Sequence, residues 1–183
     1  MARLERLALS AISADRTIVR RLVNTAVYSS SVSGQLFQAP DISGVTTFPD
    51  WTVESQNYQC YRGMAMRIKF FPIINAVTSA AGANTGLPLI NTASNWGGSA
   101  PASANESFQA PDAKVHDGHY PFSHEVDWSV NPNAQLWTRV GSAIANDNKI
   151  GISFASPTTY TLPVSTPLLI GVFEIFVEFG YFL

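Results

Sequence analysis

The feature that most constrains the fold is the stretch Leu168–Leu183, LLIGVFEIFVEFGYFL. Successive side chains of a β-strand point to opposite faces. Read with this period, one face of the stretch is almost wholly apolar, and the other carries Glu174 and Glu178 among apolar residues. Its β-branched and aromatic residues favour a pleated strand. A membrane-spanning helix would need about 20 apolar residues without charges. The stretch is therefore predicted to be a long central strand whose partners come from earlier in the chain.

Shorter segments with strand-like patterns precede this strand and are separated by turn residues. Residues 34–50, 75–86, 93–110 and 157–167 read as loops, and Pro88 predicts an edge position for its strand. Together with Leu168–Leu183, the predicted strands are Leu22–Ser33, Tyr58–Pro72, Leu87–Thr92, Ala113–His116, Phe122–Val130, Gln135–Val140 and Lys149–Ser156. This pattern predicts an all-β fold, an eight-stranded antiparallel jelly-roll sandwich.

Residues 1–21 are predicted to form an N-terminal arm, and residues 22–183 the β-domain. Apolar residues between Leu4 and Ile12 recur at helical spacing, which predicts a short amphipathic helix over residues 2–14. This helix either packs on its own domain or orders only in an assembly. The arm holds five of the eleven basic residues: Arg3, Arg6, Arg16, Arg20 and Arg21. These arginines either neutralise nucleic-acid phosphates or keep an apolar helix soluble.

Charge and cysteine content narrow the function classes. Only 13% of the residues are charged, against roughly 25% in an average globular protein. We infer that copies of the chain cover much of its surface. Cys60 is the single cysteine, so an intramolecular disulfide cannot form. Among the remaining basic residues, Arg62, Arg67 and Lys69 are predicted to contact either nucleic-acid phosphates or other subunits.

The densest group of ionisable residues contains all three histidines of the chain. Histidine with carboxylates can bind a metal or form a pH-sensitive subunit contact, and a solvated loop is the third interpretation. The candidate residues are Asp112, His116, Asp117, His119 and His124.

Glu174 and Glu178 are the candidate pair of catalytic carboxylates. As strand residues four positions apart they would have Cα atoms ~13 Å apart, which does not fit the carboxyl spacing of about 5–9.5 Å in glycosidases. No catalytic site is predicted.

Several short motifs resemble those of viral shell proteins. They comprise Trp51, the pair Tyr61-Arg62, the strand Met66–Phe71 closed by Pro72, and Gly171 followed by Glu174, Val177 and Phe179. Together they resemble the shell domain of small icosahedral virus coat proteins of the tombusvirus, sobemovirus and satellite-virus types. The resemblance covers roughly Leu22–Leu183.

The resemblance implies a non-enzymatic coat subunit that self-assembles into an icosahedral shell around a viral genome, expected to be single-stranded RNA. It further implies a place in the virion after assembly in the host cytoplasm, with neither a membrane partner nor a cofactor. The arm is less basic than in many such proteins, and no aspartate motif supports a calcium ion at subunit interfaces. The alternative is a lectin-like sandwich in which Trp96, Trp128 or Trp137 stacks on a sugar ring.

Overall fold

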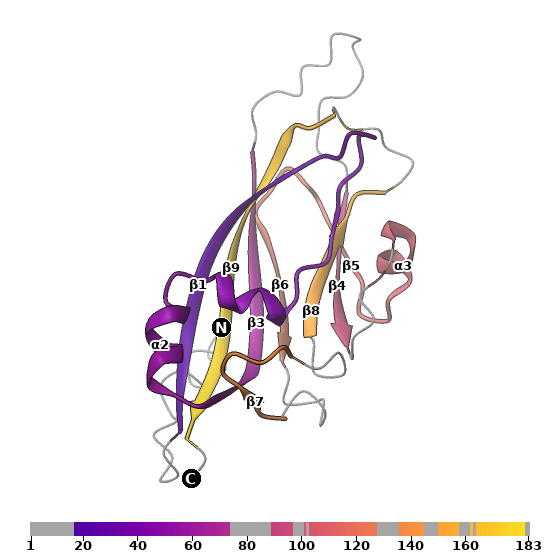
Figure 1. The fold of residues 1–183 in the computed structure, drawn as a ribbon. Coiled ribbons are helices and arrows are strands. Elements are labelled where there is room, and N and C mark those ends of the chain that lie inside the picture. Colours follow the sequence, from indigo (N-terminus) through magenta and orange to yellow (C-terminus); the bar gives the residue numbers. More distant parts are fainter. Residues whose placement is uncertain are drawn as a thin grey trace.

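Two antiparallel sheets packed face to face make up the fold (Figure 1). The computed structural model describes residues 17–73, 89–96, 101, 103–127, 136–144, 150–157, 162 and 164–181. The strand order of the first sheet is β1 (Thr17–Ser29), β9 (Pro167–Gly180), β3 (Cys60–Pro72) and β6 (Phe122–Asp127), and the short β7 (Thr138–Arg139) pairs with β3. The order of the second sheet is β2 (Phe37–Gln38), β8 (Ile150–Ala155), β4 (Ile90–Trp96) and β5 (Lys114–His116).

The strand pairs follow a simple rule along the chain. β1 pairs with β9, β2 with β8, β3 with β6, and β4 with β5. The chain therefore behaves as one long antiparallel ribbon whose successive strand pairs alternate between the two sheets. This arrangement is the jelly roll, and it confirms the predicted fold class.

The predicted central strand is confirmed as β9, which pairs with β1 on one side and β3 on the other. Its odd-numbered residues from Leu169 to Phe179 face the second sheet, and all of them are buried. They pack against Met66, Ile68 and Phe70 of β3 and Ile152 and Phe154 of β8. The alternation of residues in the sequence thus predicts correctly which residues of β9 lie on the inner face of the first sheet.

The segment predicted as a loop at residues 34–50 is mostly structured. It contains β2 and the 3-10 helix η1 (Ile42–Thr47), and the helix α2 (Trp51–Asn57) follows. Ile42, Val45 and Trp51 are buried in the core, and the side chain of Asp41 caps η1 by accepting a hydrogen bond from the Ser43 amide. The turn residues of this segment were predicted correctly. The apolar residues between them were not expected to pack in the core, where they close one end of the sandwich.

Three further predictions need correction. β1 begins at Thr17 and not at Leu22, so Arg20 and Arg21 belong to the first sheet. β4 extends to Trp96 and lies between β8 and β5, so the strand predicted around Pro88 is not an edge strand. Residues 93–110, predicted as a loop, hold the end of β4 and the helix α3 (Ala104–Gln109), which lies outside the second sheet (Figure 1).

The predicted helix at residues 2–14 and the loop at 75–86 lie outside the described residues. Within the described part of the chain, no helix has the length and apolar character needed to cross a membrane.

Candidate functional site

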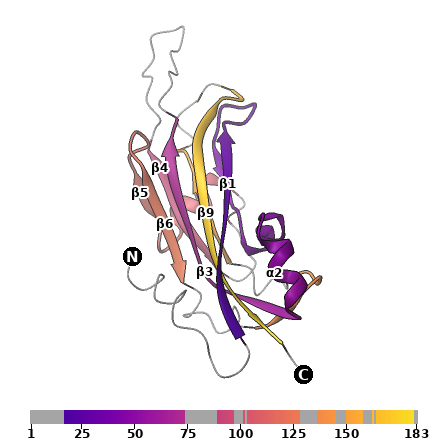
Figure 2. The ribbon, with the colours of Figure 1, turned by 90° about the vertical axis from the view of Figure 1, so that its left-hand side faces the viewer.

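The outer face of the first sheet, which points away from the second sheet, carries a network of charged side chains on neighbouring strands. At its centre, Glu174 of β9 is 1% exposed. It accepts hydrogen bonds from Arg21 of β1 at 2.5 Å, from Lys69 of β3 at 3.1 Å and from Arg67 of β3. Val23 and Arg67 are the cross-strand partners of Glu174, so the strand register brings these side chains together. Figure 2 views the molecule with β1, β9, β3 and β6 in front.

Three cations around one carboxylate set its protonation state. Burial alone would raise the pKa of Glu174, but the hydrogen bonds from Arg67, Lys69 and Arg21 outweigh burial and place its pKa below the ordinary value. A carboxylate held this way is ionised at neutral pH and joins three strands. The second glutamate of β9, Glu178, bonds to Arg62 at 2.7 Å.

The predicted nucleic-acid-binding arginines fall into two groups. Arg3, Arg6 and Arg16 lie outside the described residues. Arg20 bonds to Glu54 of α2 at 2.9 Å, and Arg21 bonds to Glu174. Arg62, Arg67 and Lys69 are likewise ion-paired with the glutamates of β9. The basic residues of β1 and β3 therefore balance carboxylates within the same subunit.

The histidine cluster divides between the protein interior and a surface loop. His124 of β6 is 2% exposed and lies between the sheets. The hydroxyl of Thr92 on β4 is 2.8 Å from His124 Nδ1 and 2.8 Å from His116 Nε2. Ser94 Oγ is 3.0 Å from His124 Nε2, and an Asp112 oxygen lies 3.7 Å from the same nitrogen. These residues join the two sheets of one subunit.

Burial dominates the titration of this interior group. It lowers the pKa of His124 to about 4, although Asp112 acts in the opposite direction and Lys114 and His116 reinforce the decrease. Burial and then Lys114 also lower the pKa of His116. Both imidazoles are therefore neutral at pH 7.

Asp117 and His119 form the other half of the predicted cluster. They lie on the exposed loop between β5 and β6, where His119 Nδ1 is 2.6 Å from Asp117 Oδ1. Hydrogen bonds from the backbone and side chain of His119 lower the pKa of Asp117. Among the described residues, no three His, Cys, Asp or Glu side chains are arranged to hold a metal ion.

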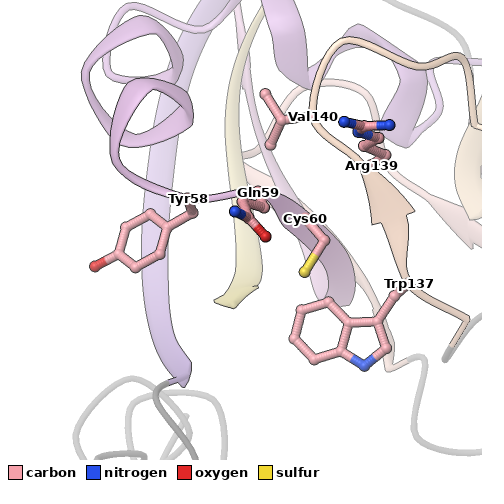
Figure 3. A pocket seen from close by; sticks show the side chains of 6 residues that line it. All are labelled: Tyr58, Gln59, Cys60, Trp137, Arg139 and Val140. Carbon is pink, nitrogen blue, oxygen red and sulfur yellow. The ribbon is translucent and has the colours of Figure 1, made fainter. Parts of the chain in front are cut away.

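A pocket of about 580 Å³ lies at the end of the sandwich where β1 begins and β9 ends. It is formed where β7 pairs with the start of β3, because Cys60 and Arg139 are cross-strand partners. Figure 3 shows Gln59 and Cys60 between the rings of Tyr58 and Trp137, with Arg139 and Val140 on the β7 side. The Cys60 thiol donates to the Gly180 carbonyl at 3.1 Å, and burial raises its pKa.

Sequence reasoning did not find this pocket. Tyr58–Cys60 and Trp137–Val140 are nearly 80 positions apart, and only the pairing of β3 with β7 brings them together. Of the tryptophans in the lectin-like alternative, Trp128 lies outside the described residues and Trp96 ends β4. Trp137 lines the pocket.

The same fold occurs in solved structures of viral capsid proteins. It is similar to the structure of Cocksfoot mottle virus, with 7% identity, a TM-score of 0.66, and coverage of 91% of this chain and 96% of that one. It is also similar to Tobacco necrosis virus, with 13% identity, a TM-score of 0.62, and coverage of 90% and 96%. A third similar structure is the decameric BFDV capsid protein, with 18% identity, a TM-score of 0.57, and coverage of 90% and 99%.

No family model and no curated protein matches the sequence. The comparisons therefore establish the jelly-roll fold through structure, and they confirm the resemblance to small icosahedral virus coat proteins that the sequence motifs indicated.

Proposed function

We propose that this chain is a viral coat subunit that self-assembles into a small icosahedral shell, encloses the genome, and has a structural role without enzymatic activity. The observation that carries the proposal is the extent of the structural match. The structural match covers 96% of the chain of Cocksfoot mottle virus, 96% of that of Tobacco necrosis virus and 99% of the BFDV capsid protein. In each case it includes about nine-tenths of this chain. The match thus extends well beyond one sheet to the whole ribbon of strands.

The low charge of the chain supports self-assembly as the mode of action. With 13% charged residues, and with the cations of β1 and β3 paired inside the subunit, the surface has few charges that would oppose contact between copies. Burial of apolar surface is the main favourable contribution to protein association. The assembled particle would be the virion, formed in the host cytoplasm.

The nucleic-acid partner is assigned to the N-terminal segment, and single-stranded RNA is the proposed genome. Because Arg20 is ion-paired with Glu54 of α2 and Arg21 with Glu174 of β9, Arg3, Arg6 and Arg16 are the arginines of the N-terminal segment that we assign to phosphate contacts. Such contacts are independent of sequence and weaken as the salt concentration rises.

The test is electron microscopy of the purified full-length chain, combined with its ratio of absorbance at 260 and 280 nm. Closed, uniform shells are the expected result. A dispersed monomer at high protein concentration and neutral pH would contradict the coat-subunit proposal.

The assignment of the arginines needs separate variants. Replacing Arg3, Arg6 and Arg16 with alanine should yield shells with a lower 260 nm absorbance, whereas replacing them with lysine should preserve the absorbance because the charge is kept. Residues 17–21 must stay in any truncation, since they form the start of β1 and include the Arg21–Glu174 bond. Equal nucleic-acid content in the alanine and lysine variants would refute this assignment.

A further inference from the structure

We propose that the pocket between β7 and the start of β3 binds a base of single-stranded nucleic acid, with Trp137 as the stacking surface and Arg139 as the phosphate contact. This inference rests on the proposed function, because it assumes that the shell encloses nucleic acid. The pocket volume of about 580 Å³ is large enough for a nucleotide.

Trp137 is held in place in a way that suits stacking. The Arg62 guanidinium lies 4.7 Å from the centre of the indole ring, a cation–π contact. The ring edge packs so closely on Gly180 that a Cβ there would come within 3.1 Å of Trp137 Cη2. Figure 3 shows the indole face-on at the border of the pocket. A fixed aromatic ring stacks on any base, because every base has a π-face.

The polar groups of the pocket are those that nucleic acid requires. Arg139 is exposed, and no carboxylate in the described part of the chain pairs with it. It differs in this respect from Arg20, Arg21, Arg62 and Arg67, which are all ion-paired. The Gln59 amide beside it can donate to and accept from a base edge.

The position of the pocket connects it to the arginine-bearing N-terminal segment. Tyr58 also lines a second pocket with Thr17, Ile18 and Tyr181. Arg16 precedes Thr17 directly in the chain, so the segment that carries the N-terminal arginines joins the described fold at this second pocket. A positive segment next to aromatic rings is the usual arrangement in proteins that bind single strands without sequence preference.

A subunit contact is the competing use of the pocket. A neighbouring copy would have to offer a carboxylate to Arg139 and an apolar group to Trp137. An exposed Arg139 without a carboxylate partner among the described residues, in a pocket with an aromatic ring, suits a phosphate and its base, so nucleic acid is the proposed occupant.

The test measures binding of the unassembled full-length chain to fluorescent oligonucleotides by anisotropy. The probes are a 12-nucleotide oligouridylate, an abasic oligomer of the same length and uridine monophosphate. Trp137→Leu should weaken oligouridylate binding about tenfold, and leave binding of the abasic oligomer unchanged, because only stacking is lost. Arg139→Ala should weaken binding of both oligomers. Uridine monophosphate should bind weakly, since the strand engages the N-terminal arginines as well.

Matched controls lie at other places on the surface. Tyr120→Ala removes an aromatic ring that is 68% exposed, and Lys114→Ala removes an exposed cation; neither should change oligouridylate binding. Arg139 is exposed, so its variant remains informative even if Trp137→Leu fails to fold.

Unchanged oligouridylate binding by Arg139→Ala would overturn the proposal. So would variants that bind both oligomers normally but no longer form shells, because the pocket would then be a subunit contact. Failure of the wild-type chain to form shells would contradict the proposed function, and microscopy detects it independently of the binding assay.

Discussion

Single residues decide how the outer face of the first sheet is held together. Glu174 is buried, and Arg21, Arg67 and Lys69 all bond to it. Glu174→Gln would leave three cations around a neutral amide. Breaking a buried ion pair from one side costs about 3–5 kcal/mol, and partial exposure of Arg21 and Lys69 to water places the expected loss near the lower end. The measurement is urea unfolding of the unassembled chain at pH 7.

Glu125→Gln is the matched control for this experiment. Glu125 lies on the same face, opposite Arg67 on the neighbouring strand, but it is exposed. Its replacement should change the free energy of unfolding by less than about 0.5 kcal/mol. Equal effects of the two substitutions would show that the network around Glu174 contributes no special stability.

The interior histidines make stability depend on pH. In the unfolded chain His124 titrates near pH 6.5, but in the folded chain its pKa is about 4. Between these values the unfolded state binds more protons, so stability is complete above about pH 6.5 and falls as the pH decreases toward 4. The expected loss is about 2 kcal/mol, since Asp112 and the Thr92 and Ser94 hydroxyls offset part of the cost of a buried charge.

His124→Asn should flatten the pH dependence of the urea midpoint between pH 6.5 and 4. His119→Asn, on the exposed loop, should leave that dependence as in the wild type. A wild-type midpoint that is constant across this range would contradict the interpretation. Glu174 acts at lower pH: its pKa is lowered, so the stability that it contributes is lost as the pH falls below about 4.5.

At the level of elements, the segment containing β2 and η1 is fixed against β8 by a close backbone approach. A Cβ at Gly151 would lie 2.4 Å from the Pro40 carbonyl oxygen and 2.9 Å from the Asp41 Cα. Both are backbone atoms, and the Ile152 amide donates to the same Pro40 carbonyl at 3.0 Å. Gly151→Ala should therefore separate the two segments and lower the free energy of unfolding by about 3 kcal/mol.

Gly44→Ala serves as the control, since nothing lies within 4 Å of the Cβ that it would add. Thermal unfolding of both variants gives the comparison. A Gly151→Ala protein as stable as Gly44→Ala would mean that the β2–η1 segment moves aside at little cost.

The elements also show where sequence reasoning works. Strands with regular alternation, β3 and β9, were predicted nearly to their ends because burial on one face imposes the period. The short helices were missed because they make only one or two turns, too few for a periodic pattern. A local signal was present for α3, in which Ser103 caps the helix and Glu106 stands three positions later, as in a capping box.

At the level of the whole molecule, the fold class could be predicted but the strand partners could not. Eight segments separated by turns indicate a sandwich, whereas the pairing of β3 with β7 depends on contacts between residues far apart in the chain. The charged network and the pocket are products of that pairing. For the same reason the sequence did not indicate the ion pair of Arg21, because its partner Glu174 lies 153 positions away.

The pairing of β9 with both β1 and β3 bears on how the chain is made. Until the ribosome has produced the residues up to Gly180, β1 has no strand partner, and β3 has partners only at its other edge, where β6 and β7 pair with it. The first sheet therefore forms only after synthesis of β9, and pairing between such distant segments is slow. A chain that stops before β9 keeps its strand edges unpaired and open to proteolysis. Chains that a translation error has shortened therefore cannot complete the first sheet, and they do not enter the assembly.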